Sequence, residues 1–343
     1  MREERAAIKA ISSYLPAGEL TNLELAEEFG DVDAGVILER TGIRVRHVAR
    51  PEECASDLGV AAARHLFESN AVSPSEIDFL LFCTQSPDYF LPTTACIMQE
   101  QLGLRTDCGA IDFNQGCSGY VYGLSLAKSL IETDVARCVL LITADTYTKY
   151  INARDKSVRT LFGDGAAATL VGAVSWSDEG SLIGPFVFGT DGRGAQQLIV
   201  PAGGMRRPFD AEAMIETEDE QGNWRSPQNL YMNGPEIFNF TLRTVPQVLD
   251  KLLLKSGRSL EEIDYFIPHQ ANKFMLERLQ RRLKIPAEKF HVELETTGNT
   301  VSSTIPIAFE SARRQGKIKA GDTVALIGFG VGYSWAATLV RVI

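Results

Sequence analysis

The chain has 343 residues, 45% of them hydrophobic and 23% charged, so it is long enough for two domain-sized units with a sizeable core. Its formal net charge of −10 argues against nucleic-acid binding, which needs clustered lysine and arginine. Six cysteines, all in the first half and none in a C-x-x-C pair, fit neither a zinc site nor a secreted disulfide scaffold. We therefore expect a reduced, cytoplasmic protein without a metal site.

We expect neither a signal peptide nor a membrane span. The N-terminal MREERAAIKA lacks the apolar stretch of a signal peptide. The long apolar run from Val324 to Val340 includes three glycines as well as Tyr, Ser, Trp and Thr. It is therefore interpreted as two buried strands joined by a turn.

Short apolar runs alternate with helical patterns along the chain. Buried strands are predicted at 78–85, 138–145 and 322–330, and helices at 60–70, 117–132, 245–257 and 305–316. The alternation of helices with continuously apolar strands indicates an α/β fold with a mostly parallel sheet.

The second half of the chain repeats the first. SPSEIDFLLF at 73–82 is echoed 186 residues later by SLEEIDYFIP at 259–268, an offset too long for a solenoid. Chance similarity between strand-entry motifs is the alternative. We predict two similar α/β halves, residues 1–175 and 176–343, with a solvated acidic excursion at 210–224.

Cys117 stands in FNQGCSGYVYG, between a strand-like and a helix-like segment. A helix N-terminus favours an anion, so we expect the pKa of this thiol to be lowered there. The flanking Gly116 and Gly119 allow backbone or ligand to come close. Such a cysteine is either a nucleophile or a buried small hydrophobic side chain, and this stretch alone does not decide between them.

A nucleophilic cysteine needs polar partners, and the second half supplies two candidates. His269 ends the predicted strand DYFIP, and strand ends are where α/β proteins place catalytic groups. Asn299 lies in a glycine-containing turn, ETTGNTVSSTIP, between a strand candidate and a helix candidate. Of the other histidines, His47 and His65 are expected to be structural or exposed, whereas His291 alternates like a strand residue.

The glycine-rich GFGVGYSW at 328–335 follows a predicted strand. It is not G-x-G-x-x-G, because Tyr333 occupies the last position, so it is a weak dinucleotide motif. A turn of this kind can expose backbone N–H groups as an oxyanion hole. Papain-like proteases share the chain order Cys, His, Asn, but this chain lacks the C-G-S-C-W signature and has a duplicated α/β pattern.

Several spaced motifs together resemble β-ketoacyl-acyl-carrier-protein synthase III of the thiolase superfamily. They are GCSGY, FGDGAAATL at 162–170, PHQAN at 268–272, TTGNTVSSTIP at 296–306 and GFGVGYSWAATLVR at 328–341. The resemblance also includes RTGIRVRHVA at 40–49 and extends to the last residues. It implies a five-layered αβαβα fold built from two similar halves, and a homodimer.

The resemblance further implies decarboxylative Claisen condensation of an acyl thioester primer with malonyl-acyl-carrier-protein, in fatty acid initiation or a specialised polyketide pathway. Cys117 would be the acylated nucleophile, and His269 and Asn299 would hydrogen-bond the thioester oxygen as malonyl loses carbon dioxide. The backbone N–H groups of Cys117 and Val331 would hold the oxyanion of the acyl group. Coenzyme A and acyl-carrier thioesters would be substrates, and no cofactor is implied.

Some positions depart from the family pattern and bear on the primer. A tryptophan that stacks on the adenine of coenzyme A aligns with Val36, and an arginine that serves the same group aligns with Lys156, whereas Arg40 is kept. A phenylalanine that limits the acyl pocket from the partner subunit aligns with Leu91. We expect Arg40 and Lys156 to bind coenzyme A and Leu91 to lie at the acyl pocket. Acetyl-coenzyme A is not expected to be the best primer.

An acidic carrier protein needs a basic docking patch on this acidic chain. The segment at 273–284, just after His269, offers Lys273, Arg278, Arg281, Arg282 and Lys284. A solvated helix face is the alternative interpretation.

Two other functions stay open. One is acyl transfer to an oxygen or nitrogen acceptor without decarboxylation, and the other is a non-catalytic partner subunit. Both make less use of the full set of Cys117, His269 and Asn299.

Overall fold

The computed structural model describes residues 4–69, 71–175 and 182–343 and contains two large sheets. The first has the strand order β1 (Glu4–Tyr14), β7 (Gly165–Ser175), β6 (Cys138–Asp145), β4 (Phe79–Cys83) and β5 (Gly109–Phe113). The second has the order β13 (Tyr265–Pro268), β14 (Thr323–Gly330), β15 (Ser334–Arg341) and β8 (Ile183–Thr190).

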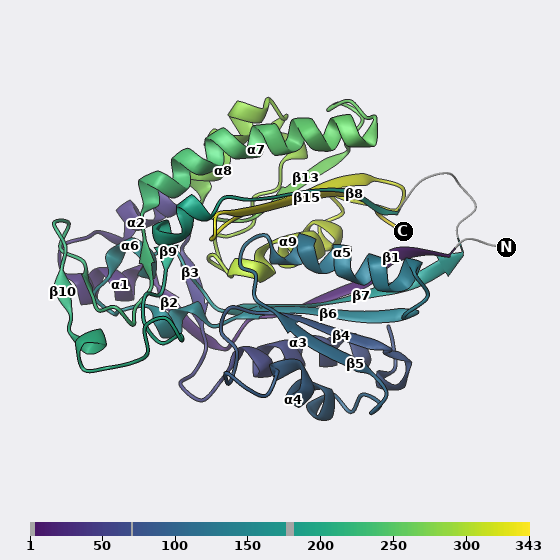
Figure 1. The fold of residues 1–343 in the computed structure, drawn as a ribbon. Helices are drawn as coiled ribbons and strands as arrows, with labels where there is room; N and C mark the ends of the chain where they lie inside the picture. The colour runs from purple at the N-terminus through teal and green to yellow at the C-terminus, as the bar shows by residue number, and fades with distance from the viewer. Residues whose placement is uncertain (1–3, 70, 176–181) are drawn as a thin grey trace.

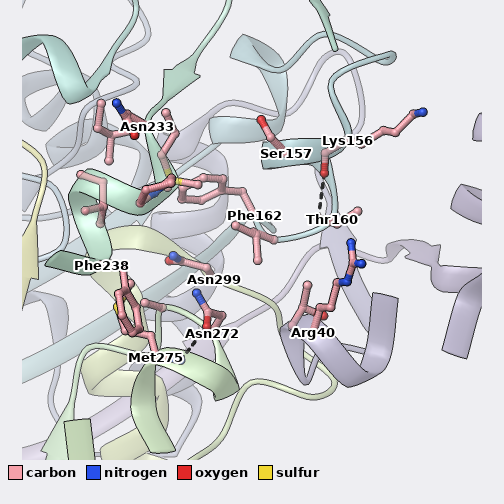
Figure 2. Close-up of a pocket in the computed structure, with 18 of the residues that line it drawn as sticks. Arg40, Lys156, Ser157, Thr160, Phe162, Asn233, Phe238, Asn272, Met275 and Asn299 are labelled. Atoms are coloured by element: carbon pink, nitrogen blue, oxygen red, sulfur yellow. Dashed lines mark hydrogen bonds between the residues drawn. The ribbon is translucent and has the colours of Figure 1, made fainter. Parts of the chain in front are cut away.

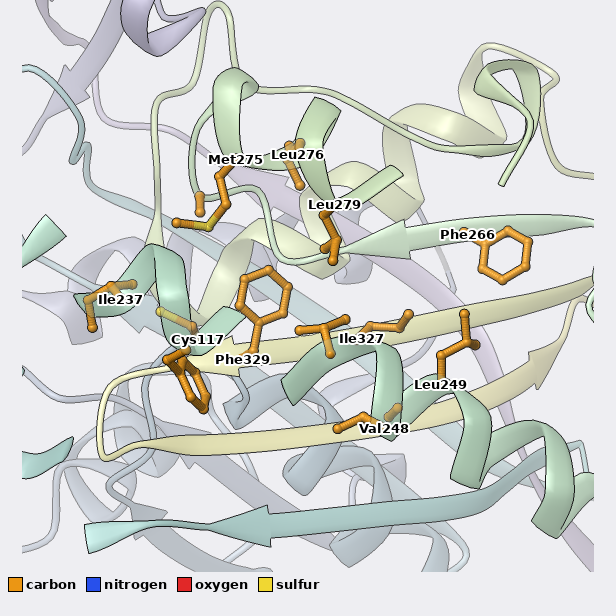
Figure 3. Packing of buried hydrophobic residues seen from close by; sticks show 14 of the residues in the cluster. Cys117, Ile237, Val248, Leu249, Phe266, Met275, Leu276, Leu279, Ile327 and Phe329 are labelled. Carbon is orange, nitrogen blue, oxygen red and sulfur yellow. The ribbon is translucent and has the colours of Figure 1, made fainter. Parts of the chain in front are cut away.

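Helices separate the two sheets and cover their outer faces, which gives the five αβαβα layers expected from the sequence (Figure 1). From one outer face to the other, the helices are α3 (Ala55–Glu68) and α4 (Thr94–Gln101), then α5 (Gly119–Glu132) and α9 (Thr304–Arg314), then α7 (Gly234–Ser256) and α8 (Lys273–Leu283). Three apolar clusters hold the layers together: one lies under each outer helix layer, and the third joins α5 and α9 to both sheets. Figure 3 shows the cluster beneath α7 and α8, where Leu249 and Leu279 lie over Ile327, with Cys117 at one end.

The expectation of a mostly parallel sheet is wrong, because both sheets are mixed. β4 pairs in parallel with β5 and β6, and β13 pairs in parallel with β14. The remaining neighbours, including the hairpin of β14 and β15, pair antiparallel. Since helices cover both faces of each sheet, an antiparallel strand here is as continuously apolar as a parallel one, and the sequence pattern does not separate them.

The repeated sequence segments occupy equivalent places in the two sheets. The 186-residue offset carries the first residue of β4, Phe79, onto the first residue of β13, Tyr265. Each of these strands has a parallel neighbour, β6 beside β4 and β14 beside β13. All strands of the first sheet precede residue 176, and all strands of the second follow residue 182.

The predicted elements are present, with differences at their ends. β6 has the predicted bounds, but α5 begins at Gly119, two residues after Cys117. α7 begins at Gly234, eleven residues before the predicted start, and it continues through Pro246. The predicted strand at His291 is wrong: only the preceding residue, Phe290, forms an isolated bridge.

Short elements gather around one end of the sheets (Figure 1). They are β2 (Gly18–Thr21), α1 (Asn22–Phe29), α2 (Ala34–Thr41), β3 (Val45–Val48), α6 (Lys156–Arg159), β9 (Leu198–Ile199), β10 (Thr217–Glu218), β11 (Trp224–Arg225) and β12 (Tyr231–Met232). No helix of the described residues is long and apolar enough to cross a membrane.

Candidate active site

Cys117 lies in the tight connection between β5 and α5, and only 4% of its surface is exposed. On either side of Cys117, this connection has space only for a glycine. A Cβ atom at Gly119 would lie 2.3 Å from the sulfur of Cys83, and one at Gly116 would lie 2.5 Å from the side chain of Val331. On the facing strand β14, a Cβ atom at Gly330 would come within 2.8 Å of the Cys117 sulfur. The nucleophile candidate is therefore enclosed by backbone.

Burial raises the pKa of the Cys117 thiol to about 12, so the expectation of a lowered pKa is wrong. The backbone N–H groups of Val331 and of Cys117 itself favour the thiolate and act in the opposite direction. Desolvation of the thiolate outweighs these two donors. The same two N–H groups are those predicted to form an oxyanion hole.

His269 follows β13 and is buried. Its Nδ1 lies 2.7 Å from the hydroxyl oxygen of Thr304, and Nε2 has no hydrogen-bond partner among the described residues. Burial lowers the pKa of the imidazole to about 3, so the ring is neutral near pH 7 and only one of its nitrogens carries a proton. The hydroxyl of Thr304 also lies 3.2 Å from the carbonyl oxygen of Val301.

Asn299 is held from both its backbone and its side chain. Its backbone N–H donates to the carbonyl of Leu161, and its Oδ1 accepts from the N–H of Val301 at 3.0 Å. This leaves the Nδ2 amide as the free donor group of the side chain. Val301 has φ of 54°, a left-handed conformation that is costly for a β-branched residue. The strained turn thus orients the amide of Asn299.

Cys117, His269 and Asn299 line a single cavity of about 1060 Å³. Of the four histidines, only His269 is part of its wall. We call these three buried residues the cavity floor. Arg40 and Lys156 also line the cavity, and Figure 2 shows both on the side of the wall opposite to Phe238 and Met275.

The sequence of this chain matches two parts of one family description. Residues 111–192 match 3-oxoacyl-[acyl-carrier-protein] synthase III, and residues 253–342 match the C-terminal part of the same family. A β-ketoacyl-[acyl-carrier-protein] synthase III from Caldanaerobacter subterraneus subsp. tengcongensis is 38% identical over 98% of this chain and 97% of its own. The chain belongs to the β-ketoacyl-[acyl-carrier-protein] synthase III family.

Solved structures of family members have the same fold. A 3-oxoacyl-(acyl-carrier-protein) synthase III structure aligns with a TM-score of 0.96 at 55% identity, covering 98% of this chain and 99% of its own. The priming β-ketosynthase of the R1128 polyketide pathway aligns with a TM-score of 0.86 at 30% identity, covering 100% of this chain and 98% of its own. The synthase III fold therefore extends over the described chain.

The structure does not bring Leu91 to the cavity of its own chain. Leu91 is 81% exposed in the loop between β4 and α4, next to the exposed Tyr89 and Phe90. The expected docking cations on and after α8 are all exposed: Lys273, Arg278, Arg281, Arg282 and Lys284. Only Arg281 has an acidic neighbour on that helix, Glu277, at 3.8 Å.

The sequence suggested that the acidic segment at 210–224 is only a solvated excursion. In the structure, part of this segment lines the cavity. Asp219, Gln221 and Asn223 line the cavity, and Arg225 follows them on its wall. Arg225 donates to Asp219 at 2.8 Å and to the buried Asp155 at 2.7 Å. We call the part of the wall formed by Asp31, Val36, Arg40, Lys156, Phe274 and residues 219–225 the cavity mouth.

Sequence reasoning missed three residues of the site: Val301, Thr304 and Arg225. Val301 and Thr304 stand inside the quoted TTGNTVSSTIP motif, but their role depends on which atoms they meet in the fold. Arg225 directly follows the acidic segment at 210–224, and this position is the one feature of the sequence that could have indicated its ion pairs. Within the described residues, no cluster of His, Cys, Asp or Glu is arranged to hold a metal ion.

Proposed function

We propose that this chain condenses an acyl thioester primer with malonyl-acyl-carrier-protein and releases carbon dioxide and a 3-oxoacyl-acyl-carrier-protein. The convergence of Cys117, His269 and Asn299 on one buried cavity supports this reaction most directly. Membership of the synthase III family supports it as well, and the likeness to a priming β-ketosynthase fits initiation of either a fatty acid or a polyketide.

The first half-reaction is acylation of Cys117. Its sulfur attacks the thioester carbonyl, a new S–C bond forms, and the bond from that carbon to the donor's sulfur breaks. The proton of the Cys117 thiol ends on the released thiol. The N–H groups of Cys117 and Val331 hold the tetrahedral oxyanion, and their stabilising effect on a negative charge at the sulfur fits this role.

The second half-reaction is decarboxylation and condensation. The carboxylate of malonyl leaves as carbon dioxide, and its electron pair forms an enolate whose oxygen accepts from the amide of Asn299 and from Nε2–H of His269. The enolate carbon attacks the acyl group, the S–C bond to Cys117 breaks, and the sulfur takes a proton from solvent. Because His269 is neutral at pH 7, its donor strength comes from position and not from charge.

The tautomer of His269 decides whether it can donate. Nε2 carries the proton only if the hydroxyl of Thr304 donates to Nδ1 at 2.7 Å, in place of the carbonyl of Val301 at 3.2 Å. The shorter distance to Nδ1 favours this arrangement. Thr304 is thus a positioning residue for the second half-reaction.

A homodimer and a cytoplasmic location complete the proposal. β5 is an edge strand of the first sheet, and the exposed Ile111 on it lies on the same half of the chain as the exposed Tyr89, Phe90 and Leu91. Unpaired edges and exposed apolar side chains favour pairing with a second copy. Leu91 would then reach an acyl pocket only across the dimer. All six cysteines are free, which fits a reducing compartment.

Intact-mass spectrometry tests the proposed function. Wild type and Cys117→Ala are incubated with a panel of acyl-coenzyme A and acyl-carrier donors, and adducts are expected on wild type alone. Malonyl carrier is then added, and release of carbon dioxide with a 3-oxoacyl product separates condensation from transfer. No adduct with any donor would indicate a non-catalytic partner subunit. Transfer to an oxygen or nitrogen acceptor without carbon dioxide release would indicate an acyltransferase.

The same panel tests the primer. The cavity is large for an acetyl group, and we expect longer or polar acyl groups to acylate Cys117 faster than acetyl does. A higher rate for acetyl in a side-by-side assay would contradict this expectation.

A further inference from the structure

A buried pair of hydroxyl groups joins the two halves of the chain beside Cys117. Ser118 comes directly after Cys117, and Ser334 is the first residue of β15. The two hydroxyl oxygens lie 2.8 Å apart, and the residues are 1% and 3% exposed. Neither residue is part of the cavity wall, so the pair does not contact a substrate in the cavity.

The two serines belong to the two segments that supply the oxyanion donors of the proposed mechanism. Ser118 ends the connection at 114–118, which we call the nucleophile turn and which contains the N–H donor of Cys117. Ser334 pairs with Gly330 across the hairpin of β14 and β15, and the second donor, Val331, lies in the turn between them. The spacing of the two donors therefore depends on how the nucleophile turn and this hairpin are held together.

The backbones of the two segments lie in direct contact. A Cβ atom at Gly328 would lie 2.7 Å from the Cα of Ser118, and one at Gly330 would lie 2.9 Å from the Cβ of Cys117. Glycine at both positions lets β14 lie against the nucleophile turn. Van der Waals contact limits how closely two segments approach, whereas a hydrogen bond also fixes their direction.

The other side of the hairpin turn is held separately. Tyr333 exchanges two backbone hydrogen bonds of 2.9 Å with Asp191, and its ring stacks on Phe240 with 4.1 Å between ring centroids. All of these contacts lie within the second half of the chain. They fix the turn to its own half and leave its position relative to the nucleophile turn to the packing of β14 and to the hydroxyl pair.

The hydrogen bonds of the pair continue into the nucleophile turn. The hydroxyl of Ser118 lies 3.4 Å from Oε1 of Gln115, to which it can donate, and Ser334 can then donate to Ser118. The backbone carbonyl of Gln115 accepts from the thiol of Cys83 at 3.1 Å. The chain of bonds thus links β15, the nucleophile turn and β4.

We infer that Ser118 and Ser334 are positioning residues of the oxyanion hole, and that their hydroxyl pair holds its two N–H donors at the spacing that one oxyanion needs. This inference rests on the proposed function. Both half-reactions form a tetrahedral oxyanion at the acyl carbon, so the pair bears on both. Such a site acts through donors that are fixed before the reaction, and a small displacement of one donor weakens it.

The double variant Ser118→Ala, Ser334→Ala is the main test. It removes both hydroxyls and leaves neither buried without a partner, so we expect chemical denaturation to show a stability close to that of wild type. The donor is the fastest of the acyl-coenzyme A and acyl-carrier panel, and acylation of Cys117 is followed by rapid-quench intact mass. At saturating donor the rate should fall about tenfold. The half-saturating donor concentration should stay nearly unchanged, because the pair does not line the cavity.

The carbonyl stretch of the acyl-enzyme gives a second readout, which a loss of stability alone does not move. The acyl group carries ¹³C at its carbonyl carbon and is observed by infrared difference spectroscopy. Hydrogen bonds to a carbonyl oxygen lower the frequency of this stretch. We expect the band to move to higher frequency in the double variant and to stay near the wild-type position in Ser334→Thr, which keeps the hydroxyl.

Thr143→Val is the matched control. The hydroxyl of Thr143 lies 3.0 Å from that of Ser303, and this pair is also buried and also joins the two halves. In the variant, Ser303 keeps its bonds to the backbone carbonyls of residue 143 and Gly165. We expect the acylation rate and the carbonyl band of wild type, because this pair belongs to neither donor segment.

The possible results separate the inference from the proposed function. A wild-type acylation rate in the double variant, or a slower rate with an unchanged carbonyl band, would overturn the inference and leave the proposed function intact. An equal loss in Thr143→Val would overturn it as well, since any hydroxyl pair between the halves would then have the same effect. Failure of every donor to acylate wild type removes the proposed function itself.

Discussion

The reacting groups at the cavity floor are buried and uncharged near pH 7, whereas the cavity mouth carries charged side chains that are exposed or half-buried. At the floor, backbone donors and the turn at Val301 hold each reacting group in one direction. At the mouth, the pair between Lys156 and Asp31 is partly exposed, and such surface ion pairs contribute little to stability and can exchange partners. We therefore expect substitutions at the floor to change the reaction and substitutions at the mouth to change substrate binding.

The largest effect should follow from removing a donor at the floor. Asn299→Asp keeps the size of the side chain and the acceptor for Val301 N–H but replaces the Nδ2 donor with a carboxylate oxygen. We expect condensation to fall by about 10² to 10³-fold, measured as carbon dioxide release from malonyl carrier. Acylation of Cys117 should persist, and loss of both half-reactions together would contradict the separate roles given to Cys117 and Asn299.

A smaller effect should follow from Thr304→Val, which removes the hydroxyl beside Nδ1 of His269 with little change in volume. The tautomer is then no longer set by this hydroxyl, and we expect condensation to fall by about tenfold, with Thr304→Ser restoring most of it. Tautomer-sensitive carbon shifts of labelled histidine, assigned with a His269→Asn variant, provide a second readout. A normal rate in Thr304→Val would remove the positioning role.

On α8, outside the cavity wall, charge reversal should affect binding and not chemistry. Arg281→Glu with Arg282→Glu should raise KM for carrier substrates by roughly three- to tenfold, with kcat nearly unchanged. Arg258→Glu, at an exposed position after α7, is the control. An unchanged KM would leave α8 as a solvated helix face.

The smallest effect on activity is expected at Asp145, where the change appears in the pH dependence of folding. Asp145 is buried at the end of β6 and accepts hydrogen bonds from the backbone N–H groups of Gln85 and Ser302. Burial raises the pKa of Asp145 to about 7, so this group destabilises the fold increasingly as pH rises from about 4 to 7. His269, with its pKa lowered to about 3, acts in the opposite direction and stabilises the fold as pH rises from about 3 to 6.5. We expect Asp145→Asn to gain a few kcal/mol relative to wild type across this window. A difference that does not change with pH in chemical denaturation would contradict the raised pKa.

Much of the fold and the floor could be predicted from the sequence. The motifs around Cys117 and His269 stand just after strands, and the repeat placed β4 and β13 equivalently. The pKa of Cys117 was predicted in the wrong direction, because the helix terminus is a local feature whereas burial depends on strands from both halves. The start of α7 was placed too late because Pro246 is typical of a first helical turn, yet here lies inside the helix.

Gly330 limits the space beside Cys117, and no larger residue fits at this position without moving the nucleophile. Even one methyl group there would come within 2.8 Å of the Cys117 sulfur. Attempts to change the acyl-chain preference of this enzyme therefore cannot use the part of the cavity formed by β14 at Gly330. The side of Cys117 that faces β14 cannot be reshaped by substitution at Gly330. Changes in chain-length preference therefore have to come from the opposite wall of the cavity or from a second copy of the protein.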